Sequence, residues 1–181
     1  MTRSRIHLYA AVTALVLTAT MTACGSTAST SPTTTTTSVA GLTASDAWVK
    51  TAPSGMTAAF LTLTNRSGTA QVLVAASSPA SAVVQIHETV SQDGRMVMRE
   101  NKDGITVPAG GTAVLEPGGD HLMLMSVTTP IVAGDVVPFT LRFASGATLT
   151  FSATAKDFSG AQESYQPAPG MSASGAQSTG P

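Results

Sequence analysis

Short apolar runs recur along the middle of the chain, and clusters of turn-forming residues such as Asn65-Arg-Ser-Gly68 separate them. No run keeps its apolar residues at the 3.6-residue spacing of an amphipathic helix. The pattern therefore predicts an all-β domain over residues 44–158, built as a sandwich or barrel of antiparallel strands. The predicted strands are 58–64, 71–75, 82–89, 95–99, 112–115, 121–127, 137–143 and 148–153.

One hairpin of this domain can be placed closely, because Asp93-Gly94 is a strong signal for a tight turn. If residues 91–94 all form the loop, His87 lies directly opposite Met98. If only Asp93 and Gly94 form the turn, Thr89 opposes Met98 and His87 lies diagonally from it. Either register brings an imidazole and a thioether to one face of the hairpin.

The run GDHLMLM contains a second histidine followed by two alternating methionines. In an extended strand, His121, Met123 and Met125 share one face, while Leu122 and Leu124 point the other way into the core. This strand therefore offers nitrogen and sulfur donors on one side.

Together the two segments give a candidate metal site of two imidazoles and two thioethers: His87, Met98, His121 and Met123. Imidazole and thioether favour Cu(I), and a set without carboxylates argues against Ca²⁺, Mg²⁺ or Mn²⁺. A blue-copper site needs a cysteine thiolate, and structural zinc does not use methionine. The competing interpretation is that the methionines only pack, which is the more common role of residues such as Met96 and Met125 taken singly.

Residues 1–23 resemble a bacterial export signal, with a positive start, an apolar stretch and small residues before Cys24. Met21-Thr-Ala-Cys24 resembles a lipobox, so we expect Cys24 to be lipidated and the protein to be exported and anchored to the outer face of the cell membrane. The alternative is an ordinary cleaved signal peptide beside an unpaired cysteine. The Ser/Thr-rich residues 24–43 are predicted to be a tether, and residues 159–181 a disordered tail.

The small net charge of the chain limits the kinds of partner that it can bind. Charged residues make up 10% of the chain, and its 9 basic and 10 acidic residues nearly cancel. A chain without a basic field is not expected to bind nucleic acid. No nucleophile paired with a base is evident in the sequence, which favours a binding protein over an enzyme.

The histidines and methionines carry a resemblance to a known family. His87 is followed by ten residues and Met98, and twenty-two further residues lead to His121-Leu-Met123. This arrangement resembles the motif of the bacterial periplasmic copper(I) chaperones of the PCu(A)C family, in which the second interval is about twenty-one residues. The turn Asn101-Lys-Asp-Gly104 lies in that interval and can absorb one extra residue. Further matching segments are Ala47–Val49, Gly55–Phe60, Val107–Gly111, Leu115–Gly119 and Val136–Leu141.

The resemblance implies a cupredoxin-like Greek-key β-sandwich or barrel that lacks the cupredoxin cysteine. It also implies that His87, Met98, His121 and Met123 bind Cu(I), and that the protein delivers copper to a cytochrome c oxidase subunit or to another copper chaperone. Two other functions stay open on the sequence alone. One is an extracellular lipoprotein that scavenges or buffers copper, and the other is a surface β-sandwich that binds partners without a metal.

Overall fold

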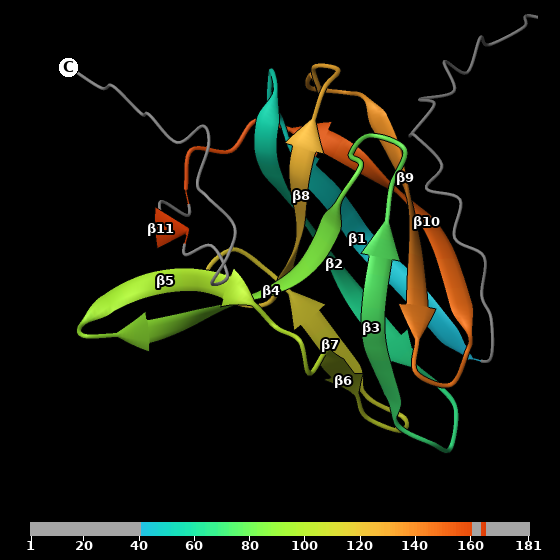
Figure 1. The fold of residues 1–181 in the computed structure, drawn as a ribbon. Coiled ribbons are helices and arrows are strands. Elements are labelled where there is room, and N and C mark those ends of the chain that lie inside the picture. Colours follow the sequence, from blue (N-terminus) through green and yellow to red (C-terminus); the bar gives the residue numbers. More distant parts are fainter. Residues whose placement is uncertain (1–40, 161–163, 166–181) are drawn as a thin grey trace, which may run out of the picture. The chain divides into compact units, whose positions relative to one another are not determined.

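The computed structural model describes residues 41–160 together with Ser164 and Tyr165, and every regular element in that part of the chain is a strand (Figure 1). No helix in the described residues is long and apolar enough to cross a membrane. The strands are β1 (Leu42–Lys50), β2 (Gly55–Asn65), β3 (Gln71–Ser77), β4 (Val84–Gln92), β5 (Arg95–Glu100), β6 (Ile105–Val107), β7 (Thr112–Leu115), β8 (His121–Val127), β9 (Val136–Phe143), β10 (Thr148–Lys156) and β11 (Ser164–Tyr165).

The strands pair in the order β11-β5-β4-β8-β2-β1-β10-β9-β3-β6, and β7 adds to β2. The sheet folds back on itself, so that β3, β9 and β10 form a layer over β8, β2 and β1 (Figure 1). Most neighbours are antiparallel, whereas β1 runs parallel to β10 and β5 runs parallel to β11. The prediction of an all-β sandwich is therefore confirmed.

The core lies between these layers and follows the period of two that strands impose on their side chains. Leu122 and Leu124 of β8 are fully buried in it, as the sequence pattern predicted. On the opposite layer, the rings of Phe139 and Phe151 stack with centroids 5.2 Å apart. The face of β8 that carries the histidine and methionines therefore points away from this core.

Three of the described strands, β1, β6 and β11, were not among the predicted runs. In β1 the segment Ser45-Asp46 interrupts the apolar alternation, and Asp46 has a φ of 54° at a shift in register with β2. Strand β6 has only three residues, which is too short for a periodic signal. Within the predicted tail, Ser164 and Tyr165 form β11 beside β5. The rest of the tail beyond residue 160, together with the predicted signal and tether up to residue 40, lies outside the described residues.

The β4–β5 hairpin adopts the shorter of the two predicted turns. Gln92 pairs with Arg95, so the loop consists of Asp93 and Gly94 alone. Their φ values of 52° and 76° are both positive, as a type I′ turn requires. Thr89 therefore opposes Met98, and the hairpin extends outward from the layered strands (Figure 1).

Candidate metal centre

Three neighbouring strands bring the predicted donors to one face. β4 places His87 directly opposite His121 of β8. Met123 lies two residues farther along β8, so it shares that face with His121. On the other side of β4, Met98 of β5 pairs with Thr89, which shares the face of His87. The register alone therefore gathers all four sequence-predicted donors on one side of the sheet.

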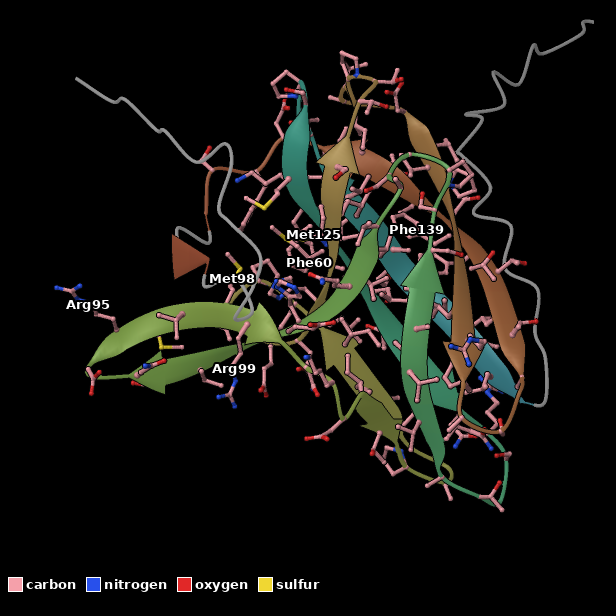
Figure 2. All side chains as sticks on the ribbon, in the orientation of Figure 1. Phe60, Arg95, Met98, Arg99, Met125 and Phe139 are labelled. Atoms are coloured by element: carbon pink, nitrogen blue, oxygen red, sulfur yellow. The ribbon has the colours of Figure 1, made fainter. Side chains whose placement is uncertain are left out.

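Met98 lies where the hairpin joins the rest of the sheet, near Phe60 in the view of Figure 2. Arg99 points to the opposite side of the hairpin, where its Nε donates to Glu88 Oε1 at 2.9 Å. Arg95 projects at the hairpin tip. The guanidinium of Arg99 is thus directed away from the thioether of Met98 (Figure 2).

Both imidazoles are buried, with 0% of His87 and 2% of His121 exposed. Their ring centroids are 5.7 Å apart and the rings are inclined at 59°. The ring of Phe60 lies on the other side of His121, at 6.1 Å. Packing on both sides fixes the orientation of the His121 ring.

Hydrogen bonds define which nitrogen of each ring can act as a ligand. His121 Nδ1 lies 2.9 Å from the carbonyl oxygen of Gly119, and a carbonyl only accepts, so Nδ1–H donates and the lone pair of the neutral ring is on Nε2. His87 Nε2 lies 3.0 Å from Gln85 Oε1, which places its lone pair on Nδ1. Both of these ring atoms, Nε2 of His121 and Nδ1 of His87, are shielded from solvent.

Burial and, to a lesser extent, the nearby charge of His121 together lower the pKa of His87 from 6.5 to about 4. The depressed value keeps His87 neutral at neutral pH. A metal can bind only the neutral form of imidazole, so this environment prepares the ring as a ligand.

Asp120 precedes His121, and the sequence left open whether its carboxylate orients the imidazole. His121 Nδ1–H donates its hydrogen bond to the Gly119 carbonyl oxygen. Asp120 instead accepts a bond from the backbone N–H of Glu116 through its own carbonyl oxygen, which closes the turn before β8. Burial raises the pKa of its carboxyl, as does the charge of Glu88, while His121 opposes that shift.

A cavity of about 140 Å³ lies beside these groups. Met98, His121 and Met123 line it, whereas His87 lies against His121 and is not part of the lining. Its remaining lining residues are Lys50, Thr51, Met56, Thr57, Ala58, Phe60, Pro117, Gly118 and Phe158. Three of the four predicted donors therefore surround one space that an ion could enter.

Aromatic rings form one side of the site. Trp48 of β1 packs against Phe60 with centroids 4.5 Å apart and against Phe158 at 5.3 Å. Phe60 and Phe158 both line the cavity. An apolar wall of this kind limits the access of water and lowers the local polarity around a bound ion.

Sequence reasoning missed Met56 of β2, which is half-buried and lines the same cavity. Its neighbours in the chain include no histidine, so no spacing marked it as a donor. Met96 is 49% exposed on the hairpin, and Met125 is half-buried outside this lining. Cys24, the predicted lipidation site, lies outside the described residues.

The chemistry of the site depends on thioethers. In residues 41–160 and 164–165, no group of three or more His, Cys, Asp and Glu side chains could hold a metal ion. The donors assembled here are neutral nitrogen and sulfur, which suit a soft ion and disfavour hard, oxygen-seeking cations.

Known proteins are similar to this chain in both sequence and fold. The model of a family described as putative lipoprotein LpqE-like matches residues 42–155. The putative lipoprotein Lxx21020 of Leifsonia xyli subsp. xyli (strain CTCB07) is 46% identical over 126 residues, which cover 70% of this chain and 76% of that protein. The solution structure of apo-DR1885 from Deinococcus radiodurans is 30% identical with a TM-score of 0.52, covering 84% of this chain and 96% of that one.

The copper-bound PCuAC domain from PmoF2 has a TM-score of 0.56 at 18% identity, covering 68% of this chain and 98% of that domain. At this identity the likeness concerns the fold, and it confirms the predicted cupredoxin-like β-sandwich. The family model spans nearly the whole described domain, from β1 to the end of β10. The chain therefore belongs to the LpqE-like family of putative lipoproteins, which is of the PCuAC type.

Proposed function

We propose that this protein binds Cu(I) at the cavity and carries it outside the cytoplasm as a chaperone. The observation that carries the proposal is the convergence of Met98, His121 and Met123 on one cavity, with His87 packed against His121. Thioether sulfur and neutral imidazole are the donors that Cu(I) prefers. The copper-bound PCuAC domain of PmoF2 has the same fold, which agrees with the proposal.

The donor set suits transport of copper rather than catalysis. All four groups are uncharged, so they bind the reduced ion without the strong, charge-assisted attachment that thiolates give. Met98 is half-buried on the hairpin strand, so a partner can reach the ion from this side. A partner with thiolate or imidazole ligands then replaces the donors stepwise.

We further propose that Cys24 anchors the protein to the outer face of the membrane and that the recipient is a copper protein such as a cytochrome c oxidase subunit or another chaperone. The similarity to putative lipoproteins supports the anchor. Delivery of copper and scavenging of copper would need the same ligands in this protein. A transfer assay to a purified apo copper protein separates them, because delivery predicts rapid loss of copper to that protein and storage predicts retention.

The binding test is an anaerobic Cu(I) competition titration with a chromogenic chelator. The protein is expected to bind one ion, and a variant with His87, Met98, His121 and Met123 all replaced is expected to lose it. Met96→Leu is the matched control, since this methionine is exposed outside the cavity. Equal retention by the protein and the fourfold variant would refute the copper site and favour a surface module without metal.

A further inference from the structure

The outer part of the β4–β5 hairpin, which extends away from the layered strands, has limited support from the rest of the sheet (Figure 1). The pairing of β4 with β8 ends at His87 and His121, whereas Met98 pairs with Thr89, beyond that last pair. Thr89 Oγ1 donates a hydrogen bond to the Gly119 carbonyl oxygen at 3.3 Å, which ties the hairpin to the turn before β8. Met98 is therefore the proposed donor that lies farthest out along this part of the sheet.

Strand β11 supplies the second neighbour of β5. Ser164 pairs with Val97 and Tyr165 pairs with Met98, in a parallel ladder on the edge of β5 that β4 does not occupy. β5 is therefore held between two strands at the residue whose side chain lines the cavity. A strand paired on both edges opens less readily than an edge strand, because each ladder restrains its backbone.

The same C-terminal segment is also fixed where it leaves β10. Thr51 Oγ1 donates a hydrogen bond to Asp157 Oδ1 at 2.7 Å. The next residue, Phe158, packs against Trp48 and lines the cavity. These contacts keep the start of the segment beside the cavity, so β11 stays at a high effective concentration near β5 after it detaches.

The ladder between β11 and β5 is short enough to open by itself. It consists of two residue pairs, whereas the ladder between β4 and β5 consists of six. Local opening of a small element costs much less free energy than unfolding of the core. β11 can therefore detach while the layered strands stay folded, and its detachment changes the restraint on Met98.

We propose that β11 is a clasp that holds Met98 in the copper site and slows the release of Cu(I). While β11 is paired, the backbone of β5 is restrained from both edges and the thioether stays on the ion. When β11 detaches, the hairpin moves more freely and a ligand of the recipient can take the place of Met98. The proposal rests on the proposed copper function and adds a control of release to it.

The first test compares the unaltered protein with two shortened chains. A stop after Gly160 removes β11, whereas a stop after Gly170 keeps it and serves as the matched control. Each protein is loaded with Cu(I) and mixed anaerobically with excess chromogenic chelator in a stopped-flow instrument.

The chain that ends at Gly160 is expected to release copper about tenfold faster than the other two proteins. This factor corresponds to about 1.4 kcal/mol, which is of the order of one or two net backbone hydrogen bonds. Equal release rates in all three proteins would overturn the proposal.

The second test uses the full-length chain and needs no copper. Ser164→Pro combined with Tyr165→Pro removes two backbone N–H groups, and proline is poorly tolerated in a ladder. Hydrogen exchange of the amides of residues 95–100 is measured by mass spectrometry in the metal-free protein. Exchange is expected to be faster in this variant and unchanged in the control, Ser172→Pro combined with Ser174→Pro.

The two tests separate failure of the clasp from failure of the copper function. Unchanged exchange in the Ser164→Pro and Tyr165→Pro variant would show that β11 does not restrain β5, whether or not the protein binds copper. Faster exchange with an unchanged release rate would show that the restraint does not control the ion. Failure of the unaltered protein to bind Cu(I) would refute the proposed function itself.

Discussion

At the scale of single residues, the site is prepared by burial before any ion arrives. The ring of His87 is neutral because desolvation lowers its pKa to about 4. His121 is oriented by the Gly119 carbonyl on one nitrogen and by Phe60 against its ring. A bound ion therefore meets groups that already have the required protonation and direction, which reduces the cost of reorganisation.

This burial predicts a pH-dependent stability of the metal-free protein. Between pH 6.5 and about 4, the unfolded chain binds a proton at His87 and the folded chain does not, so the free energy of unfolding falls as the pH falls. The pKa difference corresponds to about 3 kcal/mol at most over the whole window. Urea unfolding at pH 7.5, 6.0 and 5.0 measures the slope.

The control for this effect is His87→Gln, which removes the titrating ring and is expected to flatten the slope. The raised pKa of Asp120 has the opposite effect on stability. The folded protein binds the Asp120 proton more tightly than the unfolded chain does, so the free energy of unfolding falls as the pH rises through the pKa of this carboxyl. Asp120 is present in both proteins, so its contribution is common to the two slopes. An identical slope in His87→Gln would contradict the assignment to His87.

At the scale of elements, two turn glycines offer a matched comparison. Gly94 in the β4–β5 turn and Gly104 before β6 both have positive φ, 76° and 78°. A Cβ on Gly94 would meet nothing within 4 Å, whereas one on Gly104 would overlap the carbonyl oxygen of Leu73 in β3. Gly94→Ala is expected to cost about 1–2 kcal/mol from backbone strain alone.

Gly104→Ala is expected to destabilise the protein more than Gly94→Ala, because the overlap adds to the same strain. Asn101 Oδ1 accepts the backbone N–H groups of Asp103 and Gly104, so the turn is held tightly and cannot easily move away from β3. Chemical unfolding of both variants at pH 7.5 gives the comparison. Equal losses would mean that the turn shifts freely.

The elements also show what the sequence could predict about the site. Alternation placed His121 and Met123 on one face of a strand, and the Asp93-Gly94 signal brought Met98 to the same side in either register. The contribution of β2 could not be predicted in this way, because the order of the strands and the register between β2 and β8 decide which residues lie beside Met123. Such non-local pairing leaves no spacing in the sequence, so Met56 was missed.

At the scale of the whole molecule, the predicted lipid anchor is separate from the chemistry of the domain. The proposed donors His87, Met98, His121 and Met123 lie on β4, β5 and β8, within the described residues, whereas Cys24 precedes them by many residues. Changing Cys24 should therefore alter where the protein resides and leave its copper affinity unchanged. This independence allows the two proposals to be tested in one variant.

Cys24→Ser removes the thiol to which a lipid would be attached. The unaltered protein, produced in a bacterium that processes lipoproteins, is expected to enter the detergent-rich phase of a Triton X-114 extract. The serine variant keeps the apolar stretch of residues 6–17 but gains no acyl chains, so a labelled fatty acid is expected to enter the unaltered protein and not the variant. Partition of both proteins into the aqueous phase would instead support an ordinary cleaved signal peptide, with Cys24 as an unpaired thiol.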